Sequence, residues 1–367
     1  MPTLANLLET LGDGTVLALA GLLVGMAFGA LAQQSRFCLR AATVEVSRGM
    51  LGPKLAIWLV SFGAAVAATQ ALVLAGLLEV ASARQLAARG SLSGAVAGGL
   101  MFGAGMVLAR GCASRLLVLS ATGNLRALLS GLLVTLVAQA SYRGALSPAR
   151  EWISALWTVD GGAQRSLLAP LHGSAVAGIA IGLAWLMPGL WLARRHAAGR
   201  WRITAAGGVG LTVAAGWWAT WSISQAAFEP VAIKSVSFTG PSADTLMALI
   251  NAPSIPLGFD VGLIPGVFLG SLLAALATRE IELQGFEGGP SMLRYIAGAC
   301  LMGFGGMLAG GCAVGAGVTG GAIFASTAWL ALFFMWVGAG LTDLAVDRTG
   351  KADGRTADPA PSGLNAR

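Results

Sequence analysis

Two of the four cysteines in this chain, Cys112 and Cys312, directly follow glycine, and a third, Cys38, lies between Arg36 and Arg40. Cys38 lies in Ser-Arg-Phe-Cys-Leu-Arg, Cys112 in Ala-Arg-Gly-Cys-Ala-Ser-Arg, and Cys312 in Gly-Gly-Cys-Ala-Val-Gly. At neutral pH an unperturbed thiol is mostly protonated and is a weak hydrogen-bond donor with a soft sulfur atom. Weak binding at successive sites suits an ion path, because the ion must leave as well as enter. The three cysteines therefore predict a path for a small anion with a terminal sulfur.

A simpler role for cysteine has to be weighed against this chemistry. A buried cysteine in a helix bundle usually acts as a small hydrophobe. Cys300 lies in the middle of an apolar run, so a packing role is expected for it. The chain has no Cys-x-x-Cys pair and no small secreted domain to staple. A disulfide framework is therefore not expected.

The residues around Cys312 predict a break in the helix that carries it. Nine of the nineteen residues at 303–321 are glycine, a density that interrupts helical propensity. A break at membrane depth is tolerated only where the chain is buried or lines a cavity. Half-helices that begin after Cys112 and Cys312 would direct their N-terminal N–H groups at an anion. Supporting groups are expected at Arg36, Arg40, Arg110, Arg115, Gly111, Gly311 and Asn124.

Membrane-spanning helices must hold these residues in place. Apolar residues make up 56% of the 367-residue chain and charged residues only 11%, which is typical of membrane proteins. The uncharged runs are long and do not alternate with polar residues, which favours helices over a β-barrel. The class predicted is an all-α polytopic membrane protein with about nine transmembrane helices. They are expected near 15–34, 55–78, 90–109, 124–142, 166–193, 203–227, 261–278 and, as two helices, within 295–342.

Two segments 200 residues apart resemble each other. Residues 97–115 and 297–315 are identical at nine of nineteen positions, including Gly-Cys-Ala at Cys112 and Cys312. Such weak internal symmetry is typical of transporters built from two repeats. The segments fall on spans three and eight, which cross in opposite directions, so two inverted repeats with re-entrant half-helices are predicted, over about 15–142 and 169–342. A weaker similarity between residues 21–31 and 262–272 does not fit inverted repeats, because these segments lie on spans one and seven, which cross the membrane in the same direction.

Several segments are expected to lie outside the spans of the transporter domain at 15–345. The stretch 228–259 contains four prolines and predicts an external loop, with a short interfacial helix at 243–250. Residues 346–367 are charged and predict a disordered cytoplasmic tail. The first 14 residues carry Glu9 and Asp13 and no basic residue, unlike a secretory signal peptide, and are predicted to form a periplasmic N-terminus.

With these motifs in order, the chain resembles the YeeE/YedE family of bacterial sulfur transporters. The resemblance covers roughly 15–345 and rests on the motifs at 35–40, 110–115 with 123–126, and 310–315. It implies an inverted-repeat transporter, not an enzyme, for thiosulfate uptake across the bacterial inner membrane. It also implies a route with three cysteines, which match Cys38, Cys112 and Cys312, and a small cytoplasmic TusA-like sulfurtransferase as partner.

Other functions stay open from the sequence. A membrane thiol redox protein would pass electrons through Cys112 and Cys312, although the chain lacks Cys-x-x-Cys and a thioredoxin-like domain. A structural subunit of a larger permease is a third reading, and a permease for selenium or another sulfur compound is a fourth. The basic residues are scattered between apolar runs, so the net charge of +7 does not indicate nucleic acid. No catalytic residue, metal ligand, cofactor or nucleotide-binding loop is predicted.

The distribution of basic residues predicts the orientation of the chain. Loops after odd-numbered spans, together with the tail, carry 17 Lys and Arg residues, and the opposite side carries 6. Because these residues accumulate on the cytoplasmic side, we expect Met1 outside and Arg367 in the cytoplasm. Reporter fusions at both ends measure this. A C-terminal reporter that is active only in the periplasm would mean that the count of spans is wrong by one.

Overall fold

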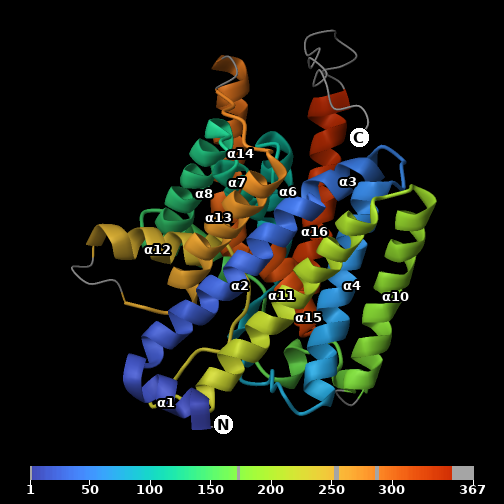
Figure 1. Ribbon diagram of the computed structural model, residues 1–367. Coiled ribbons are helices and arrows are strands. Elements are labelled where there is room, and N and C mark those ends of the chain that lie inside the picture. Colours follow the sequence, from blue (N-terminus) through green and yellow to red (C-terminus); the bar gives the residue numbers. More distant parts are fainter. Residues whose placement is uncertain (1, 172–173, 252–255, 286–288, 349–367) are drawn as a thin grey trace.

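The chain folds almost entirely into helices (Figure 1). The computed structural model describes residues 2–171, 174–251, 256–285 and 289–348. The long helices are α2 (Asp13–Ser35), α4 (Pro53–Leu74), α6 (Leu92–Leu108), α8 (Leu125–Arg143), α10 (Ala175–Arg195), α11 (Arg200–Ser224), α13 (Phe259–Thr278), α14 (Gly289–Leu308) and α16 (Ser326–Thr342). Shorter elements are α1 (Pro2–Leu11), α3 (Leu39–Ser47), α5 (Arg84–Ala87), α7 (Ala113–Ala121), α9 (Ser147–Ala155), α12 (Thr239–Asn251), η3 (Ala313–Thr319), α15 (Gly320–Ala322) and η4 (Asp343–Arg348). Two-residue strands, β1 (Gly90–Ser91) and β2 (Thr158–Val159), pair antiparallel.

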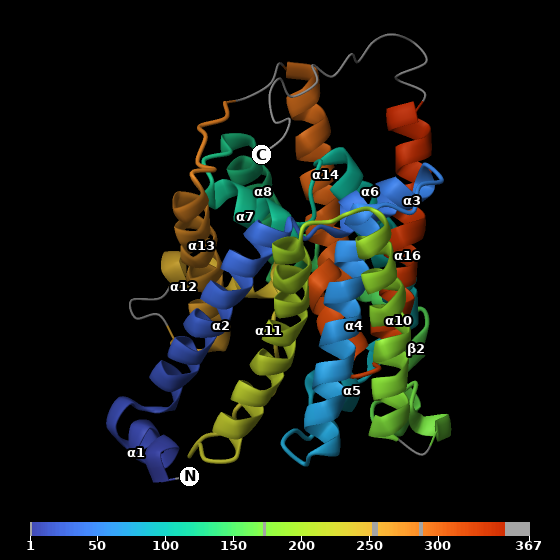
Figure 2. The same cartoon turned by 45° about the vertical axis from the view of Figure 1, so that its right-hand side comes forward.

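The nine predicted spans each coincide with one of the long helices among the described residues. Eight segments of the described chain are long and apolar enough to cross a membrane. The predicted span at 203–227 corresponds to α11, which is not one of these eight segments but whose 25 residues exceed the roughly 20 that a crossing needs. Figure 2 shows α11 between α2 and α4, against which it packs. The prediction of an all-α polytopic membrane protein is confirmed.

Several helix boundaries differ from the sequence prediction by a few residues, and the largest shift is at the fifth span. The fifth span begins at Ala175 instead of residue 166, because the Ser174 hydroxyl caps the helix by accepting a hydrogen bond from the Ala177 N–H. At the C-terminal end, η4 continues α16 through Arg348. The predicted tail beyond Arg348 lies outside the described residues.

The segment before α13 reaches into the core of the protein. Its helix, α12, contains the predicted interfacial helix at 243–250. The preceding residues Val236 and Phe238 are buried, and the Phe238 ring lies 5.2 Å from that of Phe28 on α2. Thr319 in η3 donates a hydrogen bond of 2.6 Å to the Val236 carbonyl. The loop therefore packs against the half-helix that follows Cys312.

Glycines allow two helix pairs to pack backbone against backbone. In the pair α2 and α13, a Cβ atom at Gly25 would lie 3.1 Å from the Cα of Gly266. Gly14, at the start of α2, lies beside Leu257, just before α13 begins. Because the contacts advance along both helices in the same direction, α2 and α13 run parallel. Small residues are favoured at membrane helix interfaces because the backbones can then approach closely.

The pair α6 and α14 shows the repeat relation directly. Gly298 of α14 faces Ala109, where a Cβ atom would lie 2.5 Å from the Ala109 nitrogen, and Gly98 of α6 faces Ala309 in the same way. The two contacts exchange under the 200-residue offset, and they require α6 and α14 to run antiparallel. A reciprocal contact between antiparallel elements is what inverted repeats produce at their axis. The prediction that these segments are inverted is confirmed.

This contact gives a test of the packing. We expect Gly298→Leu to force α6 and α14 apart, because the new Cβ would collide with backbone that cannot move aside, at a cost of about 1–3 kcal/mol or more. The measurement is the thermal unfolding of purified protein in detergent. The matched control is Gly207→Leu on α11, where a Cβ meets nothing within 4 Å. Equal stability of the two variants would contradict the close approach.

Candidate functional site

The same helix-ending motif occurs before each of the three candidate cysteines. The long helices α2, α6 and α14 are followed by residues in the left-handed conformation: Arg36 (φ 55°), Arg110 (φ 54°) and Gly310 (φ 82°). The next N–H then bonds to a carbonyl five residues back, from Phe37 to Ala32 (3.2 Å), Gly111 to Met106 (3.0 Å) and Gly311 to Gly306 (2.8 Å). This is the Schellman motif, which satisfies the last carbonyls of a helix.

Two of these turns place arginine where glycine is usual. The left-handed conformation costs a residue other than glycine on the order of 1–3 kcal/mol. The side chains of Arg36 and Arg110 are held by partners: Arg36 forms an ion pair with Glu280 at 3.5 Å, and the Arg110 guanidinium lies 5.9 Å from the centre of the Tyr295 ring. The strain is thus accepted at positions that carry a cation beside a helix break.

Each cysteine is the N-cap residue of the short helix that follows. The Cys38 carbonyl accepts from Ala42 at 3.3 Å and begins α3, the Cys112 carbonyl accepts from Leu116 at 2.9 Å and begins α7, and the Cys312 carbonyl accepts from Ala316 at 2.8 Å and begins η3. The predicted half-helices after Cys112 and Cys312 are confirmed. A helix N-terminus has N–H groups without intrahelical partners and a partial positive charge. All three cysteines therefore lie where an anion is favoured.

The fold brings two of the cysteines together. The sulfur atoms of Cys38 and Cys112 are 4.0 Å apart, and both residues are buried, with exposed fractions of 8% and 1%. The hydroxyl of Ser114 lies 3.4 Å from the Cys112 sulfur. Two half-helices from distant parts of the sequence thus present their N-termini and thiols at one place.

Cys312 lies apart, in the other half of the inverted pair. Cys312 follows α14, and the last residue of α14, Leu308, lies beside Gly94 at the start of α6. Cys112 follows the end of α6, so the two cysteines lie at opposite ends of this helix. The Gly315 N–H donates to the Cys312 sulfur at 3.4 Å, and Gln85 donates to the Gly315 carbonyl at 3.1 Å. A redox pair of Cys112 and Cys312 has no support here, since the thiol contact of Cys112 joins it to Cys38.

Among the predicted arginines, Arg115 stands three residues after Cys112 and acts electrostatically on the thiol pair. It lies on the first turn of α7, within electrostatic range of Cys38 and Cys112, and donates a hydrogen bond of 3.3 Å to the Oε1 atom of Gln33. Arg40 lies on the first turn of α3. Arg110 lies over the Tyr295 ring, on which the Arg126 guanidinium is also placed at 4.8 Å.

The remaining predicted residues shape the backbone. Asn124 caps α8 by accepting from Ala127 at 2.8 Å and donates to the Gln284 side chain at 2.5 Å. Gly311 has φ 157°, and a Cβ there would lie 2.7 Å from the Ala316 nitrogen, so the turn before Cys312 leaves no room for a side chain. At Gly111 a Cβ would approach the Leu116 side chain at 3.1 Å.

Sequence reasoning missed several polar neighbours of the site. Gln33 accepts a hydrogen bond from Arg115 and donates one to Glu280. Gln85 and Ser237 lie beside η3, the half-helix that follows Cys312. Gln33 stands in the Gln-Gln-Ser-Arg run before Cys38, which was a usable signal. The other three carry no local pattern. Within the described part of the chain, no group of three His, Cys, Asp or Glu side chains is placed to hold a metal ion.

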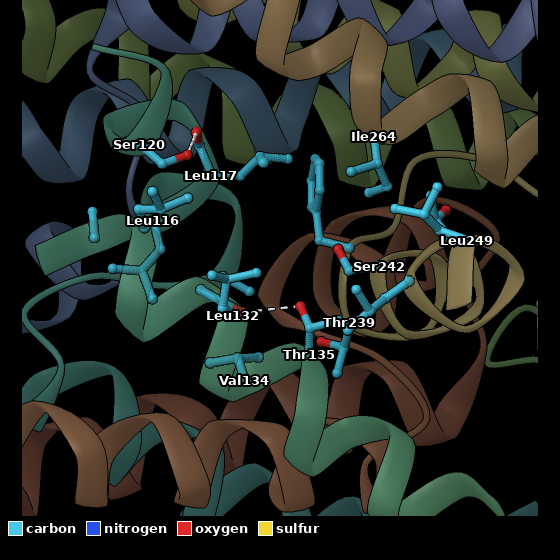
Figure 3. Close-up of a pocket in the computed structure, with 17 residues that line it drawn as sticks. Leu116, Leu117, Ser120, Leu132, Val134, Thr135, Thr239, Ser242, Leu249 and Ile264 are labelled. Carbon is cyan, nitrogen blue, oxygen red and sulfur yellow. Dashed lines mark hydrogen bonds between the residues drawn. The ribbon is translucent and has the colours of Figure 1, made fainter. Parts of the chain in front are cut away.

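A cavity of about 220 Å³ lies beside α7 but does not contain the cysteines (Figure 3). Its walls come from α7, α8, α12 and α13 and are mainly apolar, with leucine the most frequent residue and with hydroxyl groups of Ser120, Thr135, Thr239, Ser242 and Thr245. The lining contains no cation. An anion has no reason to prefer this space, so the candidate site remains the thiol pair and its arginine.

Comparison with known proteins identifies the chain's relatives. The family model described as sulphur transport matches residues 34–341. The chain belongs to this family. It is 28% identical over 345 residues to the thiosulfate transporter TsuA of Escherichia coli (strain K12), covering 87% of this chain and 92% of that protein. It is also 28% identical over 335 residues to the thiosulfate transporter TsuA of Spirochaeta thermophila, covering 87% and 96%.

Family membership fixes the class of activity. Both relatives are named as transporters, and the match extends over most of each chain. Together with the apolar helices, this makes the protein a multi-pass membrane transporter of the sulphur transport family, not an enzyme. The resemblance predicted from the cysteine motifs is confirmed.

Proposed function

We propose that the protein carries thiosulfate, or a closely related small sulfur anion, across the bacterial inner membrane along Cys38, Cys112 and Cys312. The observation that supports this most directly is the contact of two buried thiols, 4.0 Å apart, at the N-termini of α3 and α7. The names of the two TsuA relatives support the choice of thiosulfate.

The chemistry of the thiol pair suits this ion. Thiosulfate has a sulfonate end, which accepts strong hydrogen bonds, and a soft terminal sulfur. The Arg115 guanidinium and the N–H groups of the half-helices bind the oxygen atoms. The thiols donate weakly to the terminal sulfur, and no bond is made or broken. Cys312, at the other end of α6, provides a second weak site, so the ion moves between sites that each release it.

The proposed orientation places the thiol pair toward the cytoplasm. The ends of α2 and α6 face the side that carries most basic residues, which we take as cytoplasmic by the positive-inside rule. Thiosulfate would pass Cys312 first and reach Cys112 and Cys38 next. A TusA-like sulfurtransferase is the proposed recipient on that side.

A growth assay tests the substrate. The host is a bacterial strain that requires an external sulfur source for cysteine and lacks its own sulfur uptake. We expect this chain to restore growth on thiosulfate and not on sulfate, because sulfate lacks the terminal sulfur that the thiols contact. Purified protein in liposomes should then take up labelled thiosulfate without another subunit. Rescue on sulfate alone would defeat the proposal.

Cysteine variants test the path. We expect Cys38→Ala, Cys112→Ala and Cys312→Ala each to abolish most thiosulfate uptake at normal expression, since each removes one step from a series. The control is Cys300→Ala, which should retain nearly normal uptake and cost less than the roughly 2 kcal/mol of larger core truncations.

Serine at Cys112 separates sulfur chemistry from shape. Cys112→Ser keeps a donor of similar size but replaces the soft sulfur by harder oxygen, so uptake should fall at normal expression. Uptake equal to that of the parent protein would show that sulfur is not what the path requires. A Cys300→Ala variant as inactive as Cys312→Ala would overturn the distinction between path and scaffold.

A further inference from the structure

A chain of polar side chains leads from the thiol pair toward the surface. Arg115 donates to the Oε1 atom of Gln33 at 3.3 Å, and the Nε2 atom of Gln33 donates to Glu280 at 2.9 Å. The other oxygen of Glu280 pairs with Arg36 at 3.5 Å. We name these four residues, Arg115, Gln33, Glu280 and Arg36, the release network. Its members come from α7, from the C-terminal end of α2 and from the residues directly after α13.

The release network runs from half-exposed to mostly buried side chains. The side chains of Arg36 and Glu280 are 50% and 38% exposed, whereas Gln33 is only 5% exposed, Arg115 is partly buried and the cysteines are buried. The network therefore connects the buried site with water at the ends of α2 and α13. An anion that leaves the thiols toward this side passes Arg115 first and Arg36 second.

The charges of the release network set how firmly it holds an anion. The network contains two guanidinium groups, of Arg36 and Arg115, and one carboxylate, of Glu280. Its net charge is therefore positive and attracts a dianion, although the carboxylate offsets part of the positive charge. Without Glu280 both cations would be available to the ion. Conduction fails when a site binds too strongly for the ion to leave. Gln33 transmits the effect inward, because the hydrogen bond that it donates to Glu280 fixes the carbonyl that Arg115 contacts.

We propose that Glu280 is the release residue of this transporter, a fixed counter-charge that competes with the anion for Arg36 and, through Gln33, for Arg115. This inference rests on the proposed function, because it takes a small dianion as the ion that leaves. Glu280 positions and balances the two cations, and the transported ion does not need to touch it. Its removal should therefore tighten binding while slowing release.

The variant Glu280→Gln tests this, because the amide keeps an acceptor for Gln33 and removes only the charge. In liposomes we expect the KM for thiosulfate to fall about fivefold, the scale of one partly exposed charge pair, and the maximal rate to fall as well. The matched control is Glu282→Gln, two residues further on, where the carboxylate is exposed and contacts Gln284. This control should leave both values unchanged.

Charge compensation supplies the second measurement. Arg36→Gln should raise the KM about fivefold, and the double variant Arg36→Gln with Glu280→Gln should return it to near the parent value. A purely structural role for Glu280 predicts losses that add up in the double variant. An unchanged or higher KM in Glu280→Gln, or additive losses, would overturn the release role. If the parent protein itself takes up no thiosulfate, the proposed function fails instead.

Discussion

A backbone that is interrupted inside a membrane must satisfy its polar groups without water, and the rest of this structure depends on how that is done. Three helices end in Schellman turns, which use up their last carbonyls. Three short helices then begin at cysteines. Carbonyls are satisfied before each break, and each break is followed by a helix N-terminus, where N–H groups lack intrahelical partners. In η3 the sulfur of Cys312 accepts from one of these groups, the Gly315 N–H. The partial positive charge of a helix N-terminus favours an anion at each break.

Close packing surrounds these breaks. Glycines on α2, α6, α13 and α14 bring helix backbones into direct contact, and the half-helices pack against neighbouring long helices: α3 against α4, α7 against α8 and α13, and η3 against α16. In η3 and α15 every residue is buried. Glycine contributes twice here, since it permits the close approach of helices and also occupies the left-handed position before Cys312. The same residue type that weakens a helix therefore makes the interrupted helices possible.

The site combines weak donors with few charges. Thiols, a serine hydroxyl and helix N-termini surround the proposed position of the ion, and Arg115 on the same half-helix is hydrogen-bonded to Gln33. Cations concentrated without a counter-charge would give strong binding, which suits a receptor but not a path. Glu280 pairs with Arg36 directly and is linked to Arg115 through Gln33. In the proposed path, the balance of charges limits the affinity for the anion as much as the softness of sulfur does.

The sequence by itself determined the class and the local events. Long uncharged runs required membrane helices, and glycine density required a break before Cys312. The similar segments 200 residues apart fall on an odd and an even span, which predicted an inverted pair. These features depend on short-range patterns: apolar length, helix propensity and internal identity.

Tertiary structure alone decided which helix ends meet. The sequence grouped Cys112 with Cys312, whereas the fold places Cys112 against Cys38 and leaves Cys312 at the other end of α6. It also turned Asn124 into a helix cap tied to Gln284 and joined Gln33 to Glu280, which is 247 positions away. Such contacts depend on the relative placement of whole helices, which results from the summed packing of many small residues. No single residue or spacing encodes that sum, so a polar side chain at a helix end does not reveal its partner until the helices are packed.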